Sequence, residues 1–138
     1  MAYFLAKTEP DGYSIDDLAR DRETVWDGVR NAQAVNVVKT MRPGDIVLIY
    51  HSGGESAIVG VAEVISAPRP DPNEPKSWVV DVRYRGKLDR PVTLRQVKES
   101  GRFDDFALVR HGRLSTMAAP DNFVNWLRDE LGAQWAGG

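Results

Sequence analysis

The segment DIVLIYHSGGESAIVGVAEVIS, from Asp45 to Ser66, decides the fold class of this chain. Residues 45–52 are almost all apolar and β-branched, which is typical of a strand buried on both faces. The GGES at 53–56 predicts a tight turn, and residues 57–66 predict a second strand that returns beside the first. An antiparallel pair of this kind favours an α+β fold over a doubly wound parallel sheet.

The returning strand has one face with unusually small side chains. Gly60 and Ala62 lie on the same side of it, between Ile58 and Val64. Side chains this small leave space for a close neighbour, which is either a helix of this chain or a ligand.

Further short elements of both kinds flank this central pair. Residues 2–8 predict a buried strand, and residues 78–85 alternate as a half-buried strand does. Helical spacing and capping residues predict four helices, at 15–20, at 31–41, within 92–100 after a Thr93 cap, and at 120–131. We expect an irregular segment at 26–31, a loop with four prolines at 67–76, and a final strand within 106–115 around Gly112. Strands outnumber crossover helices, so the sequence favours a small α+β domain on a curved mixed sheet or partly open barrel, with helices around it.

Length and composition restrict the function classes. The chain has 138 residues, which suits one domain over 1–138, and it has no cysteine, so disulfides and thiolate metal sites are excluded. With only His51 and His111 as histidines, we expect no metal and no cofactor. The sequence has no apolar stretch near the roughly 20 residues that span a bilayer, and it begins without a basic leader. We therefore expect a cytoplasmic protein with no membrane partner.

The basic residues are unevenly distributed along the chain. The formal net charge is −2, but residues 78–113 contain nine basic and five acidic side chains. Thirteen of the 18 basic residues are arginine, whose planar guanidinium can bind phosphate or a base edge. A local excess of positive charge is equally typical of an ordinary solvated surface.

Motifs for catalysis are scarce. The sequence has no nucleophile elbow, phosphate-binding glycine loop, dinucleotide fingerprint or zinc-protease motif. His51 and Ser52 are neighbours at a strand end, so their side chains point to opposite faces and do not favour a base–nucleophile pair. Lys7 and Glu9 share one strand face, where a structural ion pair is commoner than an acid–base pair.

The segment WDGVRNAQAVN, 26–36, places an aromatic ring in a polar environment. Flipped-out bases are bound by stacking on an aromatic ring and by hydrogen bonds to the base edge. Trp26 offers a stacking face, Gly28 lets the backbone approach closely, and Arg30 can contact phosphate. The alternative is that Trp26 fills the core and Asn31 only caps the helix.

The chain resembles the EVE domain family of the PUA-like superfold, over nearly its whole length. The matching segments are YFLAKTEPDGYSIDDL, WDGVRNAQAVN, MRPGDIVLIYHS, IVGVAEV, WVVDVRYRGKLDRPVTL and LVRHGRLS, in the family's order. The resemblance implies a partly open β-barrel with a pocket for a modified nucleobase, similar to methyl-adenosine readers of the YTH family and to readers of modified cytosine. It therefore implies RNA or DNA carrying a modified base as the partner.

The resemblance also implies particular ligand-binding residues in this sequence. Thr8 stands where the family usually has serine, and Ala32 stands where it usually has an aromatic residue. The alanine predicts a roomier or differently shaped site if that aromatic residue contacts the ligand in relatives. Thr8 and Ser52 would donate or accept hydrogen bonds, Trp26 would form a wall, Asn31 would bind the base edge, and Arg30 and Arg113 would contact phosphate at the mouth. The full expected set is Lys7, Thr8, Trp26, Val29, Arg30, Asn31, Tyr50, His51, Ser52, Arg113, Leu114 and Ser115.

Two functional hypotheses follow, besides a weaker one in which the chain only binds proteins. The first is a non-enzymatic module that binds a modified base. The second is a small hydrolase acting on modified nucleosides, as in the ASCH-type amidohydrolases that the chain also resembles in superfold. Lys7, Thr8 and Glu9 would be the reactive group of such an enzyme.

Overall fold

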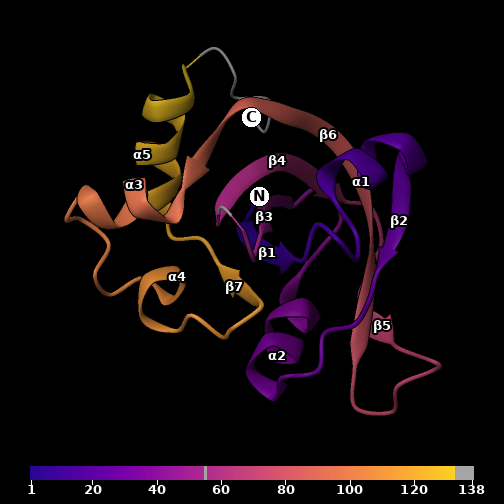
Figure 1. The fold of residues 1–138 in the computed structure, drawn as a ribbon. Coiled ribbons are helices and arrows are strands. Elements are labelled where there is room, and N and C mark those ends of the chain that lie inside the picture. Colours follow the sequence, from indigo (N-terminus) through magenta and orange to yellow (C-terminus); the bar gives the residue numbers. More distant parts are fainter. Residues whose placement is uncertain (55, 133–138) are drawn as a thin grey trace.

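The structure, a computed structural model, describes residues 1–54 and 56–132 and has one mixed sheet with helices around it (Figure 1). The strands in that sheet follow the order β2-β6-β4-β3-β1-β7, and the short β5 pairs with β6. Their bounds are β1 Tyr3–Thr8, β2 Glu23–Trp26, β3 Ile46–His51, β4 Ala57–Val64, β5 Arg69–Pro70, β6 Trp78–Thr93 and β7 Thr116–Ala118. The helices are α1 Ile15–Asp21, α2 Ala32–Thr40, α3 Leu94–Glu99, α4 Ala107–Arg110 and α5 Asp121–Leu131.

The central strand is β3, as its apolar sequence predicts. It pairs with β4 in antiparallel and with β1 in parallel orientation, so Leu48 lies between Val61 and Leu5. All three of these side chains are fully buried. The predicted turn begins with Gly53 and Gly54, which both have positive φ angles, while Glu55 lies outside the described residues. The antiparallel pair and the α+β class are confirmed.

The predicted strand at 78–85 is only the first half of β6, which continues to Thr93. Gly86 and Pro91 in the second half resemble strand breakers in the sequence. In the structure Gly86 lies opposite Val61, where the register with β4 shifts, and Pro91 is exposed. The register shifts accompany the curvature of β6, which arches over the other strands in Figure 1.

The space beside Gly60 belongs to a helix of this chain. A Cβ atom at Gly60 would lie 2.3 Å from Cδ1 of Ile15, the first residue of α1, and 2.8 Å from the Gly86 carbonyl oxygen. Ile15 is itself buried against the core. The sequence allowed either a helix of this chain or a ligand beside Gly60, and the structure shows that the helix α1 lies there.

Two predicted segments have a different structure. Trp26 ends β2 and does not lie in an irregular segment; β2 has only four residues at the sheet edge, too few for alternation to be detected. The predicted strand within 106–115 is instead the short helix α4, whose Arg110 N–H donates to the Phe106 carbonyl. The last strand, β7, begins only at Thr116. The loop at 67–76 also contains the two-residue strand β5.

The predicted helices form where their capping residues stand. Ser14 and Thr93 each complete a capping box, for α1 and α3, and Asn31 caps α2. Pro120 precedes α5 and Gly132 ends it, as predicted. Within the part of the chain that the structure describes, none of the helices is both long and apolar enough to cross a bilayer.

The sheet curves but does not close into a barrel. Its path begins at β2 and ends with β1 and β7, and β2 forms no ladder with either of them. This partly open, curved mixed sheet is the architecture that the sequence predicts. The end of β1 and the end of β2 lie on the two sides of the gap that remains.

Candidate functional site

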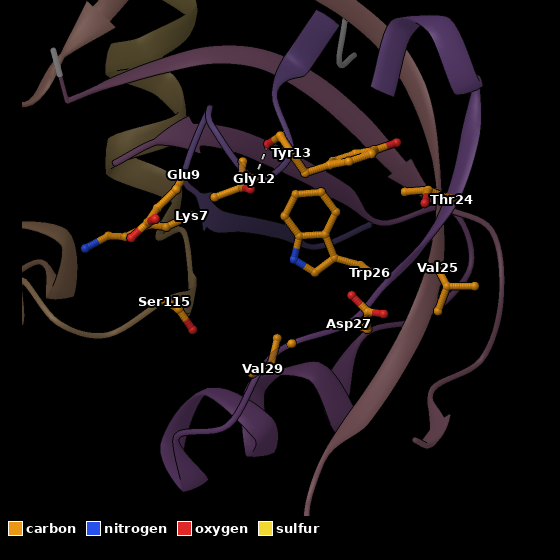
Figure 2. A pocket seen from close by; sticks show the side chains of 12 residues that line it. Lys7, Glu9, Gly12, Tyr13, Thr24, Val25, Trp26, Asp27, Val29 and Ser115 are labelled. Atoms are coloured by element: carbon orange, nitrogen blue, oxygen red, sulfur yellow. Dashed lines mark hydrogen bonds between the residues drawn. The ribbon is translucent and has the colours of Figure 1, made fainter. Parts of the chain in front are cut away.

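A cavity of about 670 Å³ occupies this gap in the sheet (Figure 2). It is within the range of about 300–1,000 Å³ that is typical of small-ligand sites. The residues that line it come from β1 and the turn after it, from β2 and the segment after it, and from the residue before β7. They are Lys7, Thr8, Glu9, Gly12, Tyr13, Thr24, Val25, Trp26, Asp27, Gly28, Val29 and Ser115.

Trp26 lies at the cavity and not in the sealed core. Its side chain is half-buried, and its ring meets that of Tyr13 at 6.4 Å between centroids with an interplanar angle of 83°. Figure 2 shows the edge of the indole directed at the Tyr13 ring, with the nitrogen-bearing edge toward the side of Ser115. Among the described residues, nothing accepts a hydrogen bond from the indole N–H. The indole therefore offers a ring surface and a donor to an occupant.

Tyr13 is fixed from several sides. Its hydroxyl donates to Asp21 over 2.9 Å, and its carbonyl accepts from the Thr8 hydroxyl over 2.8 Å. Burial is the main cause that raises the pKa of Tyr13, followed by its hydrogen bond to Asp21. The Gly12 and Tyr13 N–H groups both donate to the Glu9 carbonyl, which closes the turn between β1 and α1. This turn holds the Tyr13 ring against Trp26.

Lys7 lines the cavity, but its ammonium group is engaged elsewhere. The Nζ atom donates to the Gly112 carbonyl over 2.9 Å and lies 5.5 Å from the centre of the Tyr50 ring. Burial lowers the pKa of Lys7. Among the ion pairs of the described residues there is none between Lys7 and Glu9, which the shared strand face had suggested. Lys7 therefore ties the β1 side of the cavity to the turn after α4.

The opposite side of the cavity is formed by the segment that follows β2. Gly28 has a φ of 78°, which a residue with a side chain adopts only with strain. Val29 is buried, and its carbonyl accepts a hydrogen bond from the hydroxyl of Ser77, a buried residue just before β6. These contacts hold Asp27 to Val29 in place beside the indole.

The remaining polar groups of the cavity are available to a ligand. Ser115 accepts the Lys7 backbone N–H through its carbonyl, while its hydroxyl has no partner among the described residues. The carboxylates of Glu9 and Asp27 also have none there. The cavity thus combines an aromatic ring, an N–H donor, a hydroxyl and two carboxylates, which suits a flat heterocycle with polar edges.

The structure does not bring Tyr50, His51 and Ser52 to the cavity lining. Tyr50 is buried, His51 Nε2 accepts the Ile15 N–H over 3.0 Å, and the Ser52 N–H donates to the Thr8 carbonyl over 2.9 Å. Burial is the main cause that lowers the pKa of His51. His51 and Ser52 fasten the end of β3 to Ile15 and Thr8, the two residues that flank the turn with Tyr13.

Four other predicted residues also lie off the cavity lining. The side-chain oxygen of Asn31 accepts hydrogen bonds from the Gln33 and Ala34 N–H groups and so caps α2. This is the alternative that the sequence allows, in which Asn31 only caps the helix. Arg30 lines an adjoining hollow of about 220 Å³, which shares Asp27 and Gly28 with the cavity. Leu114 is buried in the core, and Arg113 is exposed on the turn before Ser115. Of the twelve predicted residues, those at the cavity are Lys7, Thr8, Trp26, Val29 and Ser115.

Tyr13 is the main site residue that the sequence interpretation missed. It lies in EPDGYS, which looks like a plain turn because of its proline, aspartate and glycine. The signal that could have revealed it is the aromatic residue in a segment that belongs to neither a strand nor a helix. The other lining residues that were not in the predicted set are Glu9, Gly12, Thr24, Val25, Asp27 and Gly28.

The sequence of this chain is similar to those of known proteins. The model of the EVE domain matches residues 2–130. Thymocyte nuclear protein 1 from Mus musculus is 32% identical over 124 residues, which cover 70% of this chain and 55% of that protein. The chain therefore spans only about half the length of this curated relative.

Two solved structures show the same fold. The NMR structure of Rpa0253 from Rhodopseudomonas palustris is 34% identical, with a TM-score of 0.89 over 98% of this chain and 96% of that one. Human THYN1 protein, in complex with DNA containing 5-methylcytosine, is 24% identical, with a TM-score of 0.86 over 96% of this chain and 98% of that one.

Proposed function

The chain belongs to the EVE domain family, and from this membership and the cavity beside Trp26 we propose that it binds a modified base of RNA or DNA without changing it chemically. The base would leave its strand and enter the gap in the sheet. Stacking and edge contacts, which need no reaction, would then hold it. The human relative that was solved with DNA containing 5-methylcytosine supports a nucleic-acid partner.

The observation that carries the proposal is the half-buried indole of Trp26 with an unpaired N–H group at a cavity of about 670 Å³. A tryptophan needed only for the core would be enclosed by apolar neighbours. Here the edge contact with Tyr13 fixes the ring while leaving it at the cavity. Stacking of a base on such a ring contributes about 1–3 kcal/mol.

The polar groups around the indole would select among bases. The carboxylates of Glu9 and Asp27 accept hydrogen bonds, as an exocyclic amine requires, while Ser115 and the indole N–H can donate to a ring nitrogen or carbonyl. A modification such as a methyl group would be recognised by the apolar contact it makes. One methyl group in an apolar pocket is worth about 1–3 kcal/mol.

The test is a titration with free nucleosides in matched pairs, one member modified and the other not. We would use 5-methyl-2′-deoxycytidine against 2′-deoxycytidine and N6-methyladenosine against adenosine, because they lack a strand and so report on the cavity alone. We expect the modified member of one pair to bind about 10- to 200-fold more tightly. Mass spectrometry of nucleic acid that co-purifies with the protein extends the search to other modifications. If neither modified member binds more tightly than its partner and no modified base co-purifies, the proposal is wrong.

Lys7 supports the second hypothesis, a hydrolase acting on acylated nucleosides, because it lines the cavity and burial lowers its pKa. The geometry gives this hypothesis less support, since the Lys7 ammonium donates to Gly112 and the Thr8 hydroxyl to Tyr13. Incubation with N4-acetylcytidine separates the two functions. Release of acetate that Lys7→Ala abolishes would support the enzyme, and an intact acetyl group would support binding alone.

A further inference from the structure

The two rims of the cavity differ in charge. On the rim after β2, Asp27 lines both the cavity and the adjoining hollow. Asp71, Glu74 and Arg30 line the same hollow, so that this rim has three carboxylates and one guanidinium. A phosphate on this rim would meet more negative than positive charge.

The rim on the other side is the last residue of α4 and the turn after it, residues 110–115, which contain no acidic residue. The Gly112 carbonyl of this turn accepts from Lys7, and Ser115 lines the cavity, so the turn is fastened to the site. Arg110 and Arg113 are both exposed on it. Arg110 pairs with the exposed Asp105 over 3.1 Å, a surface pair that costs little to exchange.

Arg113 differs from most arginines of this chain because its guanidinium is unpaired. Most of the others contact a carboxylate, a backbone carbonyl or an aromatic ring. In the described part of the chain, those whose guanidinium has no partner are Arg30, Arg102 and Arg113. Arg30 lies on the acidic rim and Arg102 lines no cavity near the site. Arg113 is therefore the free guanidinium of the segment 110–115, which has no carboxylate of its own.

The backbone of the same turn also has free donors. The His111 N–H donates to the Ala107 carbonyl and the Leu114 N–H to the His111 carbonyl. The N–H groups of Gly112 and Arg113, which lie between them, have no acceptor among the described residues. Backbone N–H groups and arginine are the usual contacts of phosphate oxygens.

We propose that a strand whose base enters the cavity runs its phosphates along the turn at residues 110–115, with Arg113 as the principal phosphate contact, and not past Arg30. The inference rests on the proposed function, because the base in the cavity fixes where the strand must pass. It specifies the side from which nucleic acid approaches. It also separates the two arginines that the sequence had assigned to the same role.

The experiment compares a nucleoside, which has no phosphate, with a strand. The probes are 5-methyl-2′-deoxycytidine and a short single-stranded DNA with one 5-methylcytosine, titrated between about 50 and 200 mM salt. We expect Arg113→Gln to weaken binding of the strand and to reduce the slope of log K against log salt by about 0.7, the value of one phosphate contact on a single strand. Binding of the nucleoside should be unchanged.

Arg102→Gln is the matched control, since it also removes an exposed, unpaired guanidinium, and it should leave the slope as in the wild type. Arg30→Gln is the competing variant. A change of slope in Arg30→Gln but not in Arg113→Gln would overturn the inference, as would equal slopes in all proteins. If the nucleoside binds, these outcomes leave the proposed function standing. If neither the nucleoside nor the strand binds, this inference fails, and the proposed function fails with it if no other modified nucleoside binds either.

Discussion

The cavity around Trp26 and the strand end at residues 50–52 contain similar polar residue types, but the fold uses them differently. At the cavity, the Trp26 N–H and the Ser115 hydroxyl have no partner among the described residues. At the strand end, His51 Nε2 accepts from Ile15, and the Ser52 N–H donates to Thr8. Polar groups that form hydrogen bonds within the protein stabilise the fold. Polar groups without a hydrogen-bond partner in the protein can bind a ligand.

The largest expected effect is that of Trp26→Ala on binding. Loss of one stacked base costs about 1–3 kcal/mol, which corresponds to roughly 5- to 150-fold in the dissociation constant. The fold should remain, because the side chain is only half-buried on an edge strand. Titration and thermal unfolding of the same samples measure the two effects.

Trp78→Ala is the control for this variant. Trp78 is also half-buried, but it lies off the cavity lining with the Lys39 ammonium 5.1 Å from its ring centre. The Trp78→Ala variant should bind the modified base as tightly as the wild type does, even if its thermal stability is lower. Equal binding by Trp26→Ala and the wild type would contradict the distinction between the two regions.

A smaller effect, on stability, is expected from the protonation of His51. Its Nε2 accepts the Ile15 N–H, and burial lowers its pKa below 6.5, with Asp16 opposing and Lys87 adding to the decrease. The folded state therefore takes up the proton less readily than the unfolded state, so the free energy of unfolding should fall as the pH drops below about 6.5. The hydrogen bond that is lost is worth about 0.5–1.5 kcal/mol.

Denaturant unfolding at neutral pH and at about pH 5 measures this loss. His51→Gln, which can still accept a hydrogen bond but does not titrate in this range, should flatten the pH dependence. His111→Gln is the matched control, since His111 is exposed on the turn after α4, and it should leave the dependence unchanged. Identical pH profiles for the wild type and His51→Gln would show that His51 does not fasten α1.

The smallest expected effect separates two serines. Ser115→Ala removes a free hydroxyl at the cavity and should weaken base binding by about 0.5–1.5 kcal/mol, or roughly 2- to 12-fold. Ser52→Ala should leave the affinity unchanged, because the Ser52 hydroxyl lies 3.5 Å from the Thr8 carbonyl oxygen and off the cavity lining. If Ser52→Ala weakened base binding and Ser115→Ala did not, the strand end and not the cavity would be the binding region.

Local patterns in the sequence were sufficient for most of the fold. The apolar run at 45–52 and the caps at Ser14, Asn31 and Thr93 each depend on neighbouring residues, and each was predicted. The short elements β2 and α4 were missed, since four residues are too few to establish a period. Their structure depends on strands and helices that pack against them.

The candidate site was predicted less completely, for a related reason. The sequence and its family resemblance indicated Trp26, Thr8 and Ser115, which do line one cavity. They could not indicate that His51 is bonded to Ile15, 36 residues away, because this depends on how α1 packs on the sheet. Which polar groups remain free is a property of the tertiary structure.

The gap between β2 and β1 gives an occupant of the cavity a structural role of its own. No ladder joins these two strands, although residues of both line the same space. A base held there would contact both β1 and β2 and would bridge the opening that the curved sheet leaves. The bound domain would then resist fraying of its edge strand β2 more than the empty domain does.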